Sequence, residues 1–395
     1  MELAITAHTL TSAAGAGLAA TDDALWSGRS GLRPNDLAQS ELDTFIGRVR
    51  EADSFSWPGG TDNWHSRNNA LAALGLERDG FRDAVDAAVR RFGSARVGVI
   101  LGSSTSSIGR TEEGYRDLVD GTAMPPGFDQ PDIHNPHSPS AFVAHWCGID
   151  GPAMTISTAC SSSAKVFGSA SRWLTAGFVD AVVVGGVDSL CLSVLHGFDS
   201  LELVSSARCR PFDRERDGIN IGEAAGFALV TRLDDDADAT FRLSGYGESA
   251  DAYHMSHPHP EGLGARLAME AALERAELAP ADIGYINLHG TASRANDTVE
   301  AVAVEALFPH STYASSTKGW TGHTLGAAGI VEAVVCLRSL EAGRVPGTLN
   351  LSDTDPDMAF PILKDTRETP LAHVMSNSFG FGGSNCSLVF SKVGP

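Results

Sequence analysis

Cysteine and histidine side chains stand at three points where a predicted strand ends. Cys160 follows a predicted strand at 154–157, His289 follows one at 283–288, and His323 ends a similar pattern further along the chain. In open α/β sheets, functional sites assemble at the carboxyl ends of the strands. A lone histidine there is usually structural, but one thiol and two imidazoles together could supply a nucleophile and hydrogen-bond or proton chemistry. We therefore predict that the three side chains form one site.

Cys160 lies between its predicted strand and a predicted helix that Gly177 ends. Unpaired N–H groups at a helix N-terminus stabilise negative charge, so we expect a lowered thiol pKa and a nucleophilic Cys160. The alternative is a small buried residue without a catalytic role. One face of the predicted helix carries its apolar residues, Val166, Ala170, Trp173 and Leu174.

Two further features near these residues could stabilise charge. Glu332 stands in a predicted helix at 324–337 that is apolar nearly all round. A buried carboxylate needs a partner, and Lys318 is the natural candidate; a solvent-facing glutamate is the alternative. The segment 376–385 is a glycine-rich loop, and such loops can aim backbone N–H groups at developing negative charge.

The elements that must position these residues alternate between strands and helices, which predicts an α/β fold. Several strands are apolar throughout, which indicates central strands covered on both faces. The acidic run 233–239 is predicted to be a solvated turn, and it divides the chain into a first part, 1–238, and a second part, 239–395. The predicted strands are 97–101, 154–157, 181–184, 226–230, 283–288 and 387–390.

Composition excludes several classes of protein. The 395 residues carry a net charge of −20, which argues against binding to nucleic acid or to an anionic membrane. No apolar run of about 18 residues is present, so we expect no membrane span. The N-terminal sequence lacks the pattern of a secretory signal, and the 6 cysteines are scattered. We therefore expect a cytoplasmic protein.

No sequence motif indicates a metal or a nucleotide cofactor. His254, His257 and His259 cluster, but they lack acidic or cysteine companions at ligand spacings, so we predict no metal. No glycine-rich phosphate-binding motif follows a predicted strand and opens a helix.

Several stretches in order resemble the β-ketoacyl-acyl-carrier-protein synthases. They are T-A-C-S-S-S at 158–163, H-G-T-A-S at 289–293, K-G-W-T-G-H at 318–323 and N-S-F-G-F-G-G-S-N at 377–385, with 210–218 and 251–255 in support. The resemblance implies a thiolase-like α/β fold, in which two similar halves stack as five layers, α-β-α-β-α. It places the nucleophile in the first half and both histidines in the second, and it implies a discrete type II enzyme.

The activity that this resemblance implies is a decarboxylative Claisen condensation. Cys160 would carry an acyl chain as a thioester, and malonyl-acyl-carrier protein would supply the second substrate. His289 and His323 would donate hydrogen bonds to the malonyl thioester oxygen. The backbone N–H groups of Cys160 and Phe381 would bind the oxyanion formed when the acyl thioester is attacked.

The resemblance also implies supporting roles. Lys318 would orient the histidine pair, and Glu332 would balance the local charge. Thr291 and Ser293 match positions that contact the phosphopantetheine arm of the carrier protein, although H-G-T-A-S departs from the commoner H-G-T-G-T. Phe381 matches the gating aromatic beside the cysteine. No cofactor is expected apart from the arm that carries the substrates.

The implied partners are an acyl carrier protein and a second ketosynthase-like chain. The enzyme would be a homodimer, or a heterodimer with a chain-length-factor subunit. Because the carrier is acidic, a local basic surface must meet it, and Arg67, Arg208 and Arg210 are the predicted docking residues. Fatty-acid elongation and polyketide synthesis, including aryl-polyene synthesis, both fit the sequence.

Two alternatives stay open. One is a thiolase-fold enzyme with non-decarboxylative thioester chemistry, for which Cys386 would be the second cysteine. The other is a mainly structural subunit that shapes a partner's pocket; the intact Cys160–His289–His323 set argues against it.

Overall fold

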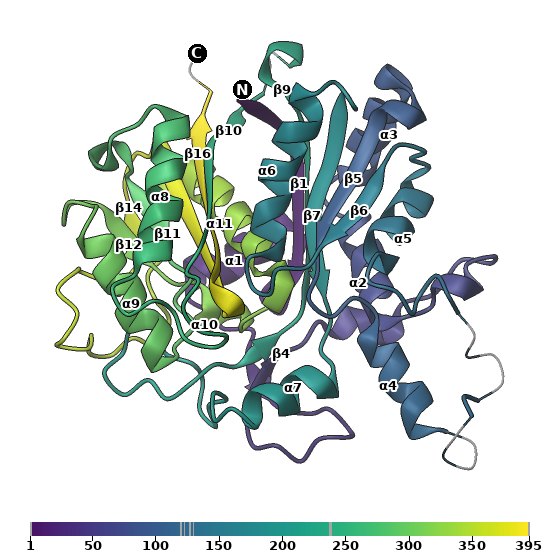
Figure 1. Ribbon diagram of the computed structural model, residues 1–395, viewed down its shortest axis with the longest axis horizontal. Coiled ribbons are helices and arrows are strands. Elements are labelled where there is room, and N and C mark those ends of the chain that lie inside the picture. The colour runs from purple at the N-terminus through teal and green to yellow at the C-terminus, as the bar shows by residue number, and fades with distance from the viewer. Residues whose placement is uncertain are drawn as a thin grey trace.

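Ten strands form most of one continuous sheet in the computed structural model, which describes residues 2–118, 121, 123–125, 128, 130–236 and 239–393 (Figure 1). Five of them lie in the first half: β1 (Leu3–Ser12), β5 (Val97–Gly102), β6 (Ala153–Ile156), β7 (Ala181–Asp188) and β9 (Ala224–Arg232). The other five lie in the second half: β10 (Phe241–Ala250), β11 (Tyr285–Asn287), β12 (Tyr313–Ser315), β15 (His373–Gly380) and β16 (Ser384–Lys392).

The two halves repeat one topology. The sheet runs β12-β11-β15-β16-β10 and then β1-β9-β7-β5-β6, so each half has its own strands in the order first, fifth, fourth, second, third. The directions also agree, because the first two pairings in each half are antiparallel and the last two are parallel. The halves meet where Leu3 pairs with Leu243.

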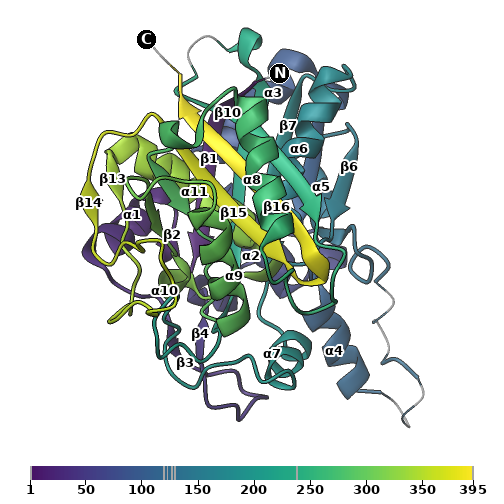
Figure 2. The same cartoon turned by 60° about the vertical axis from the view of Figure 1, so that its left-hand side comes forward.

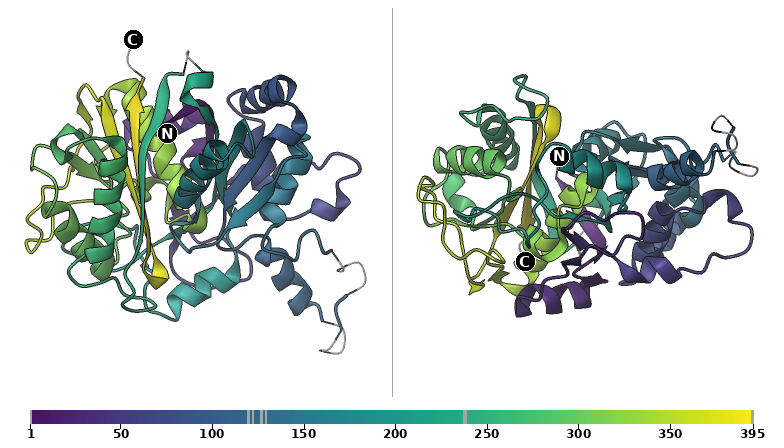
Figure 3. Two further views of the ribbon diagram at one scale, coloured as in Figure 1. Left: turned by 45° about the horizontal axis from the view of Figure 1, so that its top comes forward. Right: turned by 90° about the horizontal axis from the view of Figure 1, so that it is seen from below.

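Helices cover both halves and fill the space between them. The layer between the halves holds α6 (Ser162–Thr175) and α11 (Ala328–Ala342), whose apolar residues share one core with strands of both halves. The outer face of the first half carries α2 (Arg67–Leu76), α3 (Phe81–Phe92) and α5 (Ser138–Cys147). The outer face of the second half carries α8 (Leu263–Ala276) and α9 (Arg294–Glu305). Figure 2 shows α8 lying along β10 and β16, and Figure 3 shows the layers from two other directions.

This arrangement confirms the predicted five-layer thiolase-like fold. Strands β7 and β9 are buried on both faces, as the continuous apolar runs predicted. The remaining helices are α1 (Leu18–Ser27), α4 (Ile108–Arg116), α7 (Leu192–Asp199) and α10 (Lys318–Thr321). The short strands are β2 (Gly15–Ala16), β3 (Arg33–Pro34), β4 (Phe45–Gly47), β8 (Ile221–Gly222), β13 (Arg344–Val345) and β14 (Arg367–Glu368).

The predicted division of the chain stays a prediction. Leu233–Asp235 form a short helical turn, while residues 237 and 238, beside the predicted boundary, lie outside the described residues, as do 1, 394 and 395. Within the described part of the chain, every helix is too short or too polar to cross a membrane.

Candidate active site

Cys160 is placed by a strained turn between β6 and α6. Ala159 has φ 51°, in the left-handed region that a side chain disfavours, and Ser162 begins the helix. The turn is fixed by its own hydrogen bonds, since the Thr158 N–H donates to Ser162 Oγ at 2.9 Å. The thiol therefore lies just before the helix N-terminus, and Cys160 is only 5% exposed.

The structure brings both predicted histidines to this thiol. His323 Nε2 lies 3.0 Å from Cys160 Sγ, and the His289 and His323 rings are 5.3 Å apart and nearly perpendicular. His323 follows α10, and its backbone N–H donates to the Asn220 carbonyl at 2.7 Å. His289 follows β11 and precedes Gly290, which has φ 35°.

Gly290 could not carry a side chain here. A Cβ would lie 2.5 Å from Ser316 Cβ and 2.6 Å from the ring of Phe212, which is fully buried. The close contact fixes the backbone immediately after His289.

Hydrogen bonds select the tautomers of the two imidazoles. The Leu325 N–H donates to His323 Nδ1 at 3.3 Å, so that nitrogen is an acceptor. Lys318 Nζ lies 3.4 Å from His289 Nδ1, which makes that nitrogen an acceptor as well. Burial lowers the pKa of both histidines well below 6.5, and the Lys318 charge lowers both pKa values further. Both rings are therefore neutral and carry their proton on Nε2.

Lys318 and Glu332 form the ion pair that the sequence suggested, and both side chains are buried. The Lys318 ammonium also donates to the His289 carbonyl, which ties the cation to the histidine backbone. Burial raises the pKa of Glu332 to about 7, against the opposing effects of Lys318 and of the Ser378 hydroxyl.

The structure contradicts the expected low thiol pKa. Burial raises the pKa of Cys160 to about 11, and the Lys318 charge and the backbone N–H groups of Phe381 and Cys160 offset only part of that rise. Loss of water around the sulfur outweighs the helix terminus, because the thiolate would lie in a poorly solvated pocket. The sequence pattern could place the thiol at a helix start but could not reveal its burial.

The predicted gate and the predicted arm-binding residues lie in one pocket with the thiol. The pocket has a volume of about 180 Å³, and its lining includes Cys160, both histidines, Thr291, Ser293 and Phe381. Phe381 follows β15, is 36% exposed, and has its ring 5.6 Å from that of Phe198.

Gly380, at the end of β15, must be small, because a Cβ there would lie 3.0 Å from the Thr158 carbonyl oxygen and 3.3 Å from the Cys160 nitrogen.

The predicted docking arginines have different surroundings. Arg67 Nε donates to Glu223 at 2.8 Å and Nη1 to Asp53 at 2.6 Å, so two carboxylates already balance its charge. Arg208 is exposed and lies over the Phe45 ring at 5.1 Å, whereas Arg210 is half-buried. Their docking roles stay predictions.

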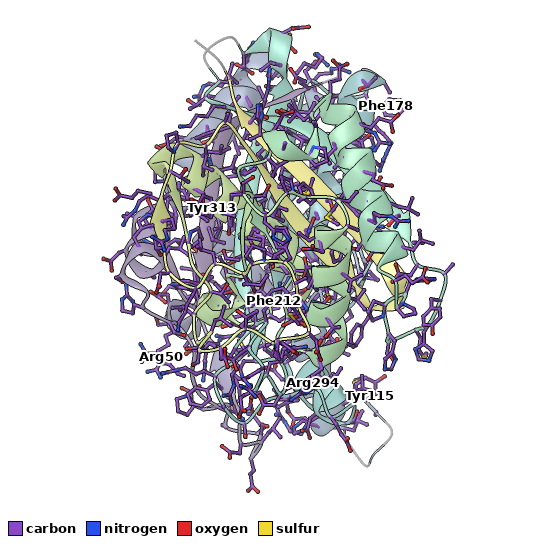
Figure 4. All side chains as sticks on the ribbon, turned by 90° about the vertical axis from the view of Figure 1, so that its left-hand side faces the viewer. Arg50, Tyr115, Phe178, Phe212, Arg294 and Tyr313 are labelled. Atoms are coloured by element: carbon purple, nitrogen blue, oxygen red, sulfur yellow. The ribbon has the colours of Figure 1, made fainter. Side chains whose placement is uncertain are left out.

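Two charged residues near the site were not predicted from the sequence. Glu300, on α9, accepts hydrogen bonds from the N–H groups of His289 and Gly290, both at 2.8 Å, and burial raises its pKa to about 7. The sequence signal for Glu300 was weaker than that for Glu332, because α9 is amphipathic and also carries an exposed glutamate, Glu305. Arg294 is exposed at the first position of α9, beside the pocket-lining Ser293 (Figure 4).

The catalytic side chains also have the chemistry of metal ligands. In the described part of the chain, the group that could hold a metal ion is the same Cys160–His289–His323 set, whose ligand atoms lie within 4.8 Å of one another. The protonated ε nitrogens and the neighbouring Lys318 ammonium favour hydrogen bonding there instead. The absence of a metal stays a prediction.

Comparisons with known proteins agree with this geometry. The family model described as "Beta-ketoacyl synthase, N-terminal domain" matches residues 70–236, and "Beta-ketoacyl synthase, C-terminal domain" matches 240–352. The 3-oxoacyl-[acyl-carrier-protein] synthase 2 of Vibrio harveyi is 35% identical over 318 residues, 76% of each chain. The chain belongs to the β-ketoacyl synthase family.

Further relatives extend the similarity of this ketosynthase to its full length. The chloroplastic 3-oxoacyl-[acyl-carrier-protein] synthase I of Hordeum vulgare is 32% identical over 99% of this chain and 89% of its own. A solved ketosynthase (ApeO) in complex with its chain length factor (ApeC) from Xenorhabdus doucetiae is 37% identical, with a TM-score of 0.90, over 99% of this chain and 98% of that one. The predicted family is confirmed, and the protein is a condensing enzyme.

Proposed function

We propose that this ketosynthase condenses an acyl group held on Cys160 with malonyl-acyl-carrier protein, releasing CO₂ and 3-ketoacyl-carrier protein. The observation that carries the proposal is the pair of imidazoles beside the thiol, each with Nδ1 held as an acceptor. Such rings can only donate from Nε2, which suits them to an enolate oxygen.

The first half-reaction transfers the acyl chain. Cys160 Sγ attacks the acyl-carrier thioester, the C–S bond to the arm breaks, and the arm leaves as its thiol with the proton from Cys160. Negative charge on the carbonyl oxygen during this step is met by the backbone N–H groups of Cys160 and Phe381. Because the free thiol has a pKa of about 11, it stays protonated until a substrate arrives.

The second half-reaction forms the new carbon–carbon bond. The malonyl thioester oxygen accepts hydrogen bonds from the Nε2–H groups of His289 and His323, and the malonyl C–C bond to the carboxylate breaks to release CO₂. The resulting enolate carbon attacks the carbonyl carbon of the acyl group on Cys160. The bond between that carbonyl carbon and Sγ then breaks. The product is the 3-ketoacyl thioester on the carrier, and the cysteine takes up a proton.

Lys318 supports the donors without taking part in proton transfer. Its ammonium fixes the His289 Nδ1 as an acceptor and keeps both pKa values low, so the rings stay neutral as the enolate forms. Glu332 pairs with the ammonium and offsets its charge, and both side chains are buried.

The substrate arm and the partners belong to the same proposal. Thr291 and Ser293 line the pocket and would contact the phosphopantetheine arm. The relative from Xenorhabdus doucetiae was solved in complex with its chain length factor, which supports a heterodimer of this kind for the present ketosynthase, with a homodimer as the alternative. The 3-ketoacyl product would serve fatty-acid synthesis or polyketide synthesis, which includes aryl-polyene synthesis.

One assay tests the proposal against both alternatives. The protein, alone and with a candidate chain-length-factor subunit, is incubated with acyl- and malonyl-carrier protein, and acyl-enzyme mass, CO₂ and 3-ketoacyl product are followed. All three are expected. An acyl-enzyme without CO₂ would support non-decarboxylative chemistry, and no acyl-enzyme would support a structural subunit.

A further inference from the structure

A buried carboxylate joins the two halves of the protein beside the site. Asp188 is the last residue of β7, and none of its side chain is exposed. Neutral donors surround it on both oxygens. Because this buried carboxylate is held by hydrogen bonds alone, moving it would leave buried donors without an acceptor, at a cost in free energy. The carboxylate therefore fixes the positions of the groups that donate to it.

Most of these donors come from the loop after β5, in the first half. Ser103 Oγ and Thr105 Oγ1 each donate to Asp188 Oδ1 at 2.6 Å, and Ser104 Oγ donates to Oδ2 at 2.8 Å. The backbone N–H groups of Ser104 and Thr105 donate as well, at 3.0 and 2.9 Å. The carboxylate is therefore rigidly fixed within the half that carries the cysteine.

The last donor belongs to the other half. The Gly326 N–H donates to Asp188 Oδ2 at 2.6 Å, and Ser104 Oγ lies 2.7 Å from the same N–H. A Cβ on Gly326 would lie 2.7 Å from that oxygen, so the backbone approaches the carboxylate as closely as glycine allows.

Gly326 lies in the turn that selects the His323 tautomer. Its neighbour Leu325 has φ 58°, an unfavourable conformation for leucine, and the Leu325 N–H is the donor to His323 Nδ1. A contact that holds Gly326 therefore holds Leu325 in its strained conformation, and with it the proton on His323 Nε2.

We propose that Asp188 is a positioning residue, which anchors the His323–Gly326 turn to the half that carries Cys160. It keeps Nε2–H of His323 directed at the reaction centre without touching a substrate. The inference rests on the proposed role of His323 as an enolate donor.

The test replaces Asp188 with asparagine. The amide keeps the shape but has one acceptor oxygen, so either the Gly326 N–H or the donors of the 103–105 loop lose their acceptor. We expect kcat for malonyl decarboxylation to fall roughly 10–100-fold with little change in KM, and Cys160 acylation to fall less. The matched control is Asp180→Asn, just before the same strand, where Asp180 pairs with Arg96 and Arg232 instead. The control should keep the wild-type rate.

A second readout separates positioning from a general loss of stability. In ¹⁵N-histidine NMR, His323, assigned by its loss in His323→Ala, should show the Nε2–H tautomer in wild type and in Asp180→Asn, and a mixture in Asp188→Asn. If Asp188→Asn does not fold, Ser104→Ala, which removes one hydroxyl from the Gly326 N–H but keeps the carboxylate, should show the same changes to a smaller extent.

Two outcomes distinguish this inference from the proposed function. A wild-type tautomer and wild-type decarboxylation in Asp188→Asn, or in Ser104→Ala where only that variant folds, would overturn the positioning role. Undiminished decarboxylation in His323→Ala would instead overturn the proposed function.

Discussion

His323→Ala, made in a Cys160→Ala background, isolates the donor role of the imidazole. Without the thiol no acyl-enzyme can form, so Cys160→Ala should show no acyl mass adduct. It should still release CO₂ from malonyl-carrier protein, because the enolate donors are separate groups. Decarboxylation then reports on the histidines alone.

The expected loss follows from what the structure removes. His323 Nε2 is one of two neutral, buried donors, and its ring is 5.3 Å from the ring of the other, so His289 still contacts the oxyanion after the substitution. Removing one such donor costs about 10²–10³-fold in rate, or about 3–4 kcal/mol of transition-state stabilisation. His289→Ala should cost a similar factor, and the double variant less than the product, because the two donors share one oxygen.

The pH dependence of the decarboxylation rate tests whether the two histidines donate as neutral rings. Burial, aided by Lys318, keeps the pKa of both histidines well below 6.5, so the rings stay neutral on both sides of that pH. Decarboxylation should therefore not fall as pH rises through 6.5, as it would if an imidazolium were the donor. A change near pH 7 that disappears in Glu332→Gln belongs to that carboxyl, whose pKa is about 7.

The assay is the initial rate of CO₂ release from malonyl-carrier protein, compared with acylation of Cys160 followed by intact mass in the variants that keep the thiol. A loss confined to decarboxylation supports the donor role. Equal, small losses in both half-reactions would show that the histidines are structural and would refute the reasoning.

Three further predictions concern stability and docking. In urea unfolding, Lys318→Met should lower the free energy of unfolding by about 3–5 kcal/mol, because Glu332 is left buried without its partner. The double variant Lys318→Met with Glu332→Leu should recover much of the lost free energy, because no buried charge is left. Arg208→Glu with Arg210→Glu should raise KM for the carrier-bound substrate and weaken its salt dependence, while a small thioester mimic is used as before; unchanged carrier kinetics would place docking elsewhere. Burial lowers the pKa of His8 from 6.5 to about 4, so below pH 6.5 the unfolded chain binds a proton that the folded chain does not. Up to about 3 kcal/mol of stability should therefore be lost as pH falls through that range, and His8→Gln should flatten the slope of unfolding free energy against pH.

Sequence patterns could place the site because its residues follow strand ends. Cys160 and His289 each follow a predicted strand closely, and His323 ends a similar strand-to-helix pattern; a parallel α/β arrangement brings such strand ends to one edge. The Lys318–Glu332 ion pair could also be predicted, because a carboxylate buried in an apolar helix needs a cation as its partner. The family resemblance then supplied the chemistry.

Other features depended on distances that no local pattern contains. The thiol pKa is set by burial under elements from both halves, and its expected direction was wrong for that reason. Asp188 and Glu300 bind backbone N–H groups rather than charged side chains, so no complementary residue in the sequence pointed to them. Strands β10 and β15 were missed as well: residues 376–380 of the predicted glycine-rich loop form the end of β15, and β10 joins the two halves where Leu243 pairs with Leu3.

The repeated topology explains why the nucleophile and a histidine meet. β6 is the third strand of the first half and leads through Cys160 into α6; β12 is the third strand of the second half and leads through α10 and His323 into α11. Because α6 and α11 pack together in the layer between the halves, the turns before them converge. Cys160 and His323 thus occupy corresponding positions, and the 3.0 Å contact between them follows from the duplication of one α/β unit.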